Sequence, residues 1–218
     1  MSGVFITFEG TEGGGKSTQI ARLAERLSGL GLKVRQLREP GGTPIGEEIR
    51  HTLKHSAVNA AMTPEAELLL MNASRAQLVC EVIRPALAAD EVVLCDRFYD
   101  STTAYQGHGR ELDLARVQSV IQFAVGETIP HLTLLLRVPL EVSEARRLAR
   151  GAGERDRFEE SSRDFFRRVE RGYDAIAASE PSRFLVIDAT RSVEQVAEDV
   201  WLATQPVLQS RRSRLKVS

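Results

Sequence analysis

The sequence predicts a three-layer α/β/α fold, in which helices cover both faces of a five-stranded parallel sheet. Short apolar, β-branched runs alternate with helix-length segments along the chain, which is typical of a parallel sheet. Several of these runs, such as LTLLL, are apolar without interruption, as expected of strands that are buried on both faces. The first run leads directly into a glycine-rich turn and then a helix. Together these observations indicate an α/β domain with a parallel sheet.

The strands and helices can be placed in chain order. The apolar runs predict strands over 4–8, 33–37, 92–95, 132–138 and 183–187. Apolar residues spaced by threes and fours predict helices over 16–29, 63–87, 111–125, 159–178 and 192–204. Turn-rich charged segments interrupt this pattern at 39–46, 105–110 and 150–159. Since ligands of open parallel sheets bind beyond the carboxyl ends of the strands, we expect the site there.

Composition limits the kind of protein. The chain has 218 residues, 42% hydrophobic and 27% charged, which suits one compact domain; we expect it over 1–205, followed by a flexible basic tail over 206–218. The net charge of -1 gives no bulk attraction to nucleic acid or membranes, so we expect neither as a partner. A membrane-length apolar run and a signal peptide are both absent from the sequence, which predicts a cytoplasmic protein. Cys80 and Cys95 lack metal-site spacing and are expected to be reduced, buried thiols.

The segment from Gly10 to Ser17 matches the phosphate-binding pattern G-x-x-x-x-G-K-[ST], between a predicted strand and a predicted helix. Backbone N–H groups of such a loop wrap a phosphate where no Cβ intrudes, and the following helix N-terminus adds partial positive charge. Lys16 is expected to neutralise phosphate charge, and Ser17 to ligate Mg²⁺ brought with ATP. The predicted ATP-binding residues are Gly10, Thr11, Glu12, Gly13, Gly14, Gly15, Lys16, Ser17 and Thr18.

The loop alone leaves several classes of P-loop protein open. A guanine-reading Asn-Lys-x-Asp motif is absent, since the only asparagines are Asn59 and Asn72, and an Asp-x-x-Gly switch motif is missing too. These absences disfavour a switch GTPase. At the end of the third predicted strand, Asp96 would lie near the metal and Arg97 near the anions. Ser17 and Asp96 are therefore the predicted metal ligands.

Five stretches of the sequence resemble bacterial thymidylate kinases, over about residues 4 to 200. They are FEGTEGGGKST (8–18), REPGGT (38–43), LLLMNASRAQLV (68–79), DRFYDSTTAYQ (96–106) and DRFE (156–159). The stretch that follows Asp96 is the specific one, because many proteins share a P-loop. The resemblance implies a fold like that of P-loop nucleoside monophosphate kinases, with a short lid over about 148–160, and a homodimer formed through helices.

The resemblance also implies how dTMP is bound. The implied dTMP-binding residues are Arg38, Met71, Asn72, Arg75, Arg97, Ser101, Thr102, Tyr105 and Gln106. Arg97 would grip the 5′-phosphate, with Arg38 as a second candidate, because a planar guanidinium holds two oxygens at once. Arg75 would read the thymine carbonyl and Thr102 the ring-nitrogen edge. Tyr105 would pack on the sugar and disfavour ribonucleotides.

Two positions depart from the family pattern. Met71 replaces the aromatic residue that stacks on thymine in relatives, although a thioether can also pack against a ring. The P-loop variable positions carry no basic side chain, so the charge on the transferring phosphoryl group must be met from the lid. Arg155 and Arg157 are the predicted lid contacts. With Lys16, Arg97 and Glu12, which would face the sugar 3′-hydroxyl, they complete the predicted catalytic set.

The resulting hypothesis is phosphoryl transfer from MgATP to the 5′-phosphate of dTMP, giving dTDP for dTTP synthesis. One alternative is a kinase for another nucleotide, since a single methyl group contributes only about 1–3 kcal/mol to discrimination. The other is a P-loop ATPase that acts as a switch module and contacts DNA through the basic tail.

Overall fold

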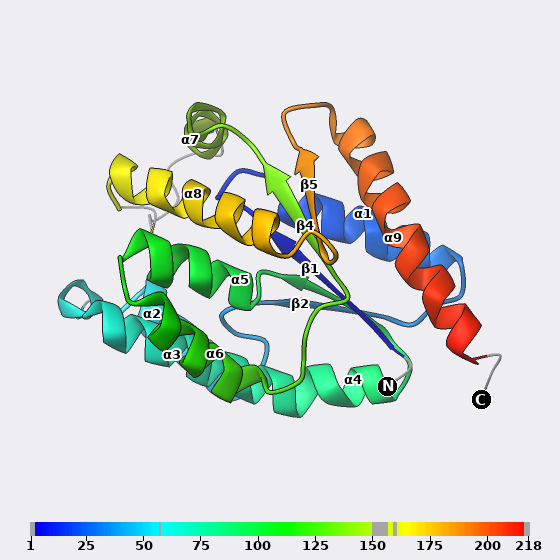
Figure 1. Ribbon diagram of the computed structural model, residues 1–218, viewed down its shortest axis with the longest axis horizontal. Helices are drawn as coiled ribbons and strands as arrows, with labels where there is room; N and C mark the ends of the chain where they lie inside the picture. The colour runs from blue at the N-terminus through cyan, green and yellow to red at the C-terminus, as the bar shows by residue number, and fades with distance from the viewer. Residues whose placement is uncertain (1–2, 57, 150–156, 159–160, 216–218) are drawn as a thin grey trace.

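A computed structural model describes residues 3–56, 58–149, 157–158 and 161–215 of the chain. Its centre is a five-stranded sheet in the order β2-β3-β1-β4-β5, with every neighbouring pair parallel. Helices α1 and α9 lie against one face, and α3, α4, α6 and α8 lie on the other side (Figure 1). The predicted three-layer α/β/α fold with its five-stranded parallel sheet is confirmed.

The bounds of the elements follow chain order. The strands are β1 (Val4–Glu9), β2 (Val34–Arg38), β3 (Val92–Asp96), β4 (Leu132–Arg137) and β5 (Phe184–Asp188). The α-helices are α1 (Lys16–Gly29), α2 (Pro44–Lys54), α3 (Pro64–Leu78), α4 (Arg84–Ala88), α5 (Tyr99–Thr102), α6 (Leu114–Val125), α7 (Leu140–Ala149), α8 (Arg163–Ser179) and α9 (Val193–Leu215). A 3₁₀ turn, η1 (Asn59–Ala61), and two π-helical turns, η2 (Val79–Ile83) and η3 (Thr103–Gly109), complete the described elements.

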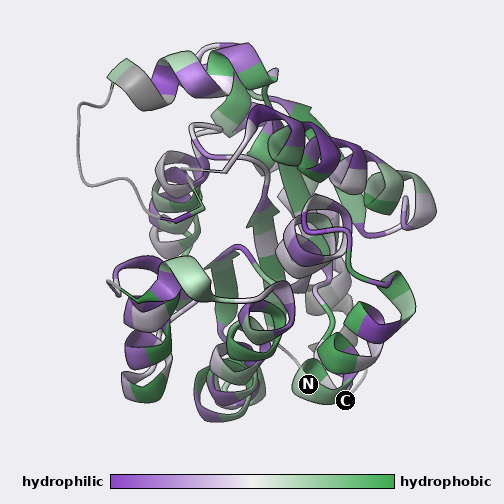
Figure 2. Cartoon of the chain, turned by 90° about the vertical axis from the view of Figure 1, so that its left-hand side faces the viewer, coloured by the Kyte–Doolittle hydropathy of each residue, from purple (hydrophilic) through white to green (hydrophobic). Residues whose placement is uncertain are grey.

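The three central strands, β1, β3 and β4, are mostly apolar because both faces of the sheet are covered there. In β1, Val4, Ile6 and Phe8 pack in the core shared with α1 and α9, whereas Phe5 points to the opposite core under α3 and α6. This alternation is the period of two that a strand imposes on its side chains. Figure 2 shows the resulting pattern, with hydrophobic strands at the centre. The two-sided burial explains why the central strands are nearly continuous apolar runs, whereas the edge strand β2 carries Arg35, Gln36 and Arg38.

Two segments expected to be turns contain helix. In 39–46, Thr43 caps the N-terminus of α2 by accepting a hydrogen bond from the Gly46 N–H, and Pro44 occupies the first turn. Both residue types favour helix starts as well as turns. The 105–110 segment lies mostly in η3. The domain was expected to end at residue 205, but α9 continues to Leu215. Leu208, on this part of α9, is buried in the core between the sheet, α1 and α9.

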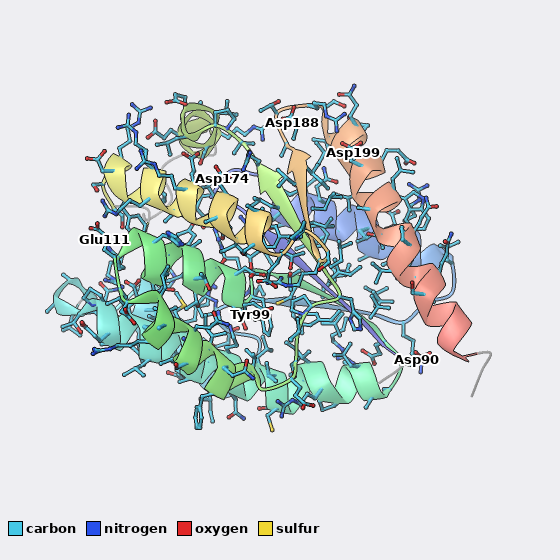
Figure 3. The ribbon with its side chains drawn as sticks, viewed as in Figure 1. Asp90, Tyr99, Glu111, Asp174, Asp188 and Asp199 are labelled. Carbon is cyan, nitrogen blue, oxygen red and sulfur yellow. The ribbon has the colours of Figure 1, made fainter. Side chains whose placement is uncertain are left out.

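Figure 3 marks the two ends of the sheet: Asp90 lies just before β3 at the amino end, and Asp188 is the last residue of β5 at the carboxyl end. On the α9 face, the single tryptophan, Trp201, packs against Arg26 of α1, whose guanidinium carbon lies 4.1 Å from the ring centre.

Both cysteines are free thiols; Cys95 is buried as expected, whereas Cys80 is exposed. Among the described helices, none has the length and apolarity needed to cross a membrane.

Candidate active site

The P-loop joins β1 to α1 at the carboxyl end of the sheet. Gly10 has a φ of +128°, and a Cβ there would lie 2.5 Å from the carbonyl oxygen of Leu136 in β4. Gly15 caps α1 with a φ of +85°, in the left-handed region that glycine adopts without strain. The first glycine is therefore required by the neighbouring strand, and the last by the turn into the helix.

Lys16 and Ser17 begin α1 and face the loop. The Lys16 Nζ donates hydrogen bonds to the carbonyl oxygens of Gly10 (3.1 Å) and Thr11 (2.9 Å), so the ammonium lies over the mouth of the loop. The Ser17 hydroxyl donates to Asp96 Oδ2 at 2.9 Å, which brings the two predicted metal ligands together between the start of α1 and the end of β3. A hydroxyl and a carboxylate are hard oxygen ligands of the kind that Mg²⁺ prefers, and Mg²⁺ commonly binds one or two carboxylates together with substrate phosphates. These residues fit the predicted metal.

Arg97 follows β3 in a strained backbone conformation. Its φ of 69° lies in the left-handed region, which costs a non-glycine residue on the order of 1–3 kcal/mol. Its N–H donates to the carbonyl of Phe8 at 2.9 Å, which holds this conformation at the end of β1. The strain is consistent with a residue that must place its side chain in the space between the P-loop and α5.

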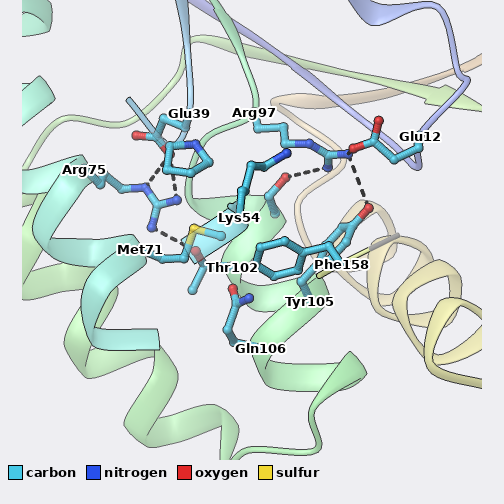
Figure 4. A pocket seen from close by; sticks show the side chains of 12 residues that line it. Glu12, Glu39, Lys54, Met71, Arg75, Arg97, Thr102, Tyr105, Gln106 and Phe158 are labelled. Carbon is cyan, nitrogen blue, oxygen red and sulfur yellow. Dashed lines mark hydrogen bonds and ion pairs between the residues drawn. The ribbon is translucent and has the colours of Figure 1, made fainter. Parts of the chain in front are cut away.

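The Arg97 guanidinium is surrounded by hydroxyl groups and one carboxylate. Its Nη1 donates to Ser101 Oγ (3.1 Å) and Tyr173 Oη (3.3 Å), and its Nη2 to Glu12 Oε1 (3.1 Å) and Tyr105 Oη (3.3 Å). Figure 4 shows Arg97 and Glu12 meeting above the ring of Tyr105. Glu12 therefore lies at the acceptor side of the site, where it also lines the cavity that Tyr105 borders.

The charges in this cluster shift one another's pKa. Burial and the nearby Arg97 cation lower the pKa of Lys16 from 10.5 to about 8. Burial alone would raise the pKa of Glu12, but Arg97 and Lys16 outweigh it and lower that pKa from 4.5 to about 2. Burial raises the pKa of Tyr105 to about 12 despite Arg97, so its hydroxyl keeps its proton at neutral pH. The buried Lys16 and the partly buried Arg97 thus bring two cations to a position suited to anionic substrates.

Two cavities meet at Arg97. The first lies over the P-loop and is lined by Gly13, Gly15, Lys16, Ser17, Thr18, Arg38, Arg50 and Asp96. The second, shown in Figure 4, is lined by Pro40, Met71, Arg75, Ser101, Thr102, Tyr105, Gln106 and Phe158. Both cavities are also lined by Glu12, Glu39, Lys54 and Arg97. Lys16 and Arg97 therefore border the same space, as a donor and an acceptor phosphate require.

Arg75 has every donor engaged within the chain. Its Nε and Nη2 bind Glu39 Oε2, at 2.8 and 2.6 Å, and Nη2 also donates to the carbonyl of Phe98. Its Nη1 donates to Asn72 Oδ1 (3.0 Å) and Thr102 Oγ1 (2.9 Å). Because Thr102 accepts this bond, the proton of its own hydroxyl is left to donate elsewhere. Arg75 can read a base directly only by exchanging one of these bonds.

The other predicted residues lie in different surroundings. Arg38 is half exposed, donates to Glu47 at 3.0 Å and borders the P-loop cavity. Asn72 is buried behind Arg75 and is not among the residues that line the acceptor cavity. Gln106 lines that cavity and donates to the buried Glu67 at 2.6 Å.

The predicted lid arginines divide between described and undescribed parts of the chain. Arg155 lies outside the described residues. Arg157 contacts Glu67 and donates to Met62 Sδ at 3.7 Å. Its guanidinium lies 5.2 Å from the ring centre of Phe158, which lines the acceptor cavity.

The structure adds residues that the sequence did not reveal. Glu39, Lys54 and Phe158 line the acceptor cavity, and Glu9 and Tyr173 contact the groups that surround Arg97. Glu9 left one signal in the sequence, a charged residue that continues a strand in which only Thr7 is polar. Glu39 and Phe158 lie within the stretches REPGGT and DRFE, although neither was given a role there. Lys54 and Tyr173 reach the site only through tertiary packing.

The fold and this pair of cavities define a P-loop nucleotide kinase, with an anion-binding loop on one side and a guanidinium-lined acceptor cavity on the other. The family model for thymidylate kinase matches residues 8–200. The chain belongs to the thymidylate kinase family, and it is accordingly a nucleoside monophosphate kinase.

Individual relatives agree with this assignment. The chain is similar to thymidylate kinases from Syntrophotalea carbinolica (49% identity, covering 94% of this chain and 96% of that protein) and Geotalea daltonii (52% identity, covering 92% and 96%). It is also similar to the crystal structure of thymidylate kinase from Ehrlichia chaffeensis, with a TM-score of 0.75 and 32% identity over 93% of this chain and 98% of that one. The predicted family resemblance is confirmed.

Proposed function

We propose that this protein transfers the γ-phosphoryl group of MgATP to the 5′-phosphate of dTMP, giving dTDP and ADP for dTTP synthesis. The observation that carries the proposal is that Arg97 borders both cavities, with Lys16 on its P-loop side and Thr102 on its acceptor side. Membership of the family supports dTMP as the acceptor, because the relatives are thymidylate kinases. The activity needs the donor and acceptor phosphates at one place, and the two cavities share Arg97 there.

In this proposal the reaction requires alignment and charge neutralisation more than proton transfer. An oxygen of the dTMP phosphate attacks the γ-phosphorus, a new P–O bond forms, and the bond to the leaving ADP oxygen breaks. Since the attacking phosphate is already anionic, no strong general base is needed. Arg97 holds the acceptor phosphate, and Lys16 with the loop N–H groups holds the donor. Arg155 is the proposed lid contact to the transferring group, and Glu12 faces the acceptor sugar.

Ser17 and Asp96 are the proposed ligands of Mg²⁺, which arrives with ATP. Their oxygens lie 2.9 Å apart at the P-loop cavity, and both are hard ligands. When bound, the ion would neutralise charge on the β- and γ-phosphate oxygens.

We propose that the Thr102 hydroxyl donates a hydrogen bond to the base. Arg75 donates to Thr102 Oγ1, which turns the hydroxyl proton away from Arg75 and makes it available to an acceptor on the base. Met71 lines the same cavity and can pack on the thymine ring through its thioether. Tyr105 and Gln106 complete the proposed wall around the nucleoside.

The test of this proposal is the Arg97→Ala variant. We expect it to bind ATP with near-normal affinity and to lose turnover by about 10³-fold or more, because arginine contacts in comparable phosphoryl transfers contribute roughly 10³ to 10⁵ to the rate. A coupled assay for ADP formation at saturating dTMP measures turnover, and calorimetric titration with a nonhydrolysable ATP analogue measures donor binding. A near-normal rate at saturating dTMP would contradict the assigned role.

We also propose that the protein is a homodimer that associates through α3 and α6. These helices pack side by side, yet Leu69 on α3 and Phe123 on α6 are exposed. Phe123 leaves 92% of its surface accessible, which is costly for a phenylalanine unless another surface covers it.

A further inference from the structure

Glu9, the last residue of β1, is a fully buried carboxylate directly before the P-loop. It accepts hydrogen bonds from the Phe98 N–H (2.8 Å), the Ser101 hydroxyl (2.5 Å) and the Tyr173 hydroxyl (2.9 Å). All three donors are neutral groups. Burying a charge against neutral donors is unfavourable compared with leaving it in water. Stability alone gives no reason for a carboxylate at this position.

The two hydroxyls lie between Glu9 and Arg97. Ser101 Oγ and Tyr173 Oη are 3.0 Å apart, and both donate to the same oxygen, Oε2 of Glu9. Each hydroxyl has only one proton, so a hydroxyl that donates to Glu9 has its oxygen lone pairs left for another donor. That donor is Nη1 of Arg97, at 3.1 and 3.3 Å. Glu9 therefore draws both hydroxyl protons toward itself, and the lone pairs of the two oxygens are left to accept from Arg97.

This arrangement turns one edge of the guanidinium toward the substrate side. Nη1 donates to Ser101 and Tyr173, whereas Nη2 donates to Glu12 and Tyr105 at the boundary of the two cavities. A phosphate can bind the Nη2 edge by replacing Glu12 as its acceptor. Arginine has a long, flexible side chain, and ordering it costs conformational entropy. Because the two hydroxyl oxygens already hold Nη1 in place, less conformational entropy is lost when the substrate binds. Pre-organisation of this kind raises affinity.

We propose that Glu9 is a positioning residue for the acceptor phosphate. It holds the hydroxyls of Ser101 and Tyr173 as acceptors for Arg97, and so fixes the guanidinium edge that receives the dTMP phosphate. The inference rests on the proposed role of Arg97 in binding that phosphate. Glu9 itself touches no substrate and acts only through Arg97.

A double-mutant cycle between Glu9 and Arg97 tests this role. We expect Glu9→Gln, which keeps the shape but loses the charge, to weaken dTMP binding by about tenfold in calorimetric titration. We expect the affinity for an ATP analogue to change less than about twofold. In an Arg97→Ala background, Glu9→Gln should have no further effect on dTMP binding, because the group through which it acts is gone.

Thr7→Val is the matched control on the same strand. It removes a buried hydrogen bond, between Thr7 and Thr133 at 2.9 Å, without touching the groups around Arg97. We expect it to lower stability but to leave dTMP affinity unchanged. Equal losses of dTMP affinity in Thr7→Val and Glu9→Gln would overturn the inference, as would a Glu9→Gln effect that persists in the Arg97→Ala background.

Tyr173→Phe keeps the test decisive if Glu9→Gln fails to fold. It removes one of the two bridging hydroxyls and keeps the buried ring, so we expect about a threefold loss of dTMP affinity that disappears in the Arg97→Ala background. No loss, or a loss that remains in that background, would refute the positioning role. If Arg97→Ala itself left dTMP affinity intact, the proposed phosphate contact would be wrong, which separates the two failures.

Discussion

At the scale of single residues, burial and charge conflict at Glu9. Burial, and next the nearby carboxylate of Asp100, raise the pKa of Glu9 from 4.5 to about 7, although Arg97 opposes the shift. The folded chain therefore binds this proton more tightly than the unfolded chain does. The contribution of this group to the free energy of unfolding is highest below pH 4.5 and falls as the pH rises toward 7.

The pH dependence of stability should show this shift. Each pKa unit corresponds to about 1.4 kcal/mol. Between about pH 4.5 and 7.5, the free energy of unfolding of wild type should therefore fall by about 3 kcal/mol relative to that of Glu9→Gln. Urea unfolding of both proteins across that range measures the difference. Glu12→Gln is the control, because the pKa of Glu12 is about 2 and the group stays ionised throughout. If the stability difference between wild type and the Glu9→Gln variant is flat with pH, the prediction is wrong.

At the scale of elements, the approach of α8 to η3 brings Tyr173 to Arg97. Gly172 in α8 lies against the ring of His108, where a Cβ would come within 2.9 Å of that side chain. Gly109 in η3 makes a similar approach, since its Cβ would lie 2.6 Å from Phe165 of α8. The two glycines allow the helices to meet closely enough for the Tyr173 hydroxyl to reach the site.

Gly172→Ala should therefore destabilise the protein. Overpacking typically costs about 1–3 kcal/mol, which exceeds the gain of up to about 1 kcal/mol from helix propensity. Gly29→Ala is the matched control, because a Cβ at this helical glycine meets no atom within 4 Å. We expect the melting temperature to fall in the first variant and to stay level or rise in the second. Equal melting temperatures would show that α8 and η3 can separate without cost.

The elements also show what a sequence can and cannot predict. Strands such as β4 were predictable because two-sided burial demands an unbroken apolar run. Helix α2 was missed because Thr43 and Pro44 favour turns as much as helix starts. Residues of the P-loop were predictable because phosphate binding fixes their spacing, whereas Tyr173 reaches the site through contacts between distant segments.

At the scale of the whole molecule, the exposed apolar surface predicts association. Phe123→Asp places a charge at the centre of the proposed interface on α6 and should convert the protein to a monomer. Leu202→Asp is the control, since Leu202 is also exposed but lies on α9 in the opposite layer. Light scattering at several concentrations measures the mass. A monomeric wild type, or a dimer that survives Phe123→Asp, would contradict the proposal.

The position of Trp201 has a practical consequence for spectroscopy. The indole lies on α9 beneath Arg26 of α1, on the sheet face opposite the core that α3 and α6 share. Its fluorescence therefore reports on the packing of the helix that carries Lys16, and an emission change on adding ATP would signal a movement of α1. Occupation of the thymine cavity alone should leave the emission nearly constant, so one intrinsic fluorophore separates the two ligands.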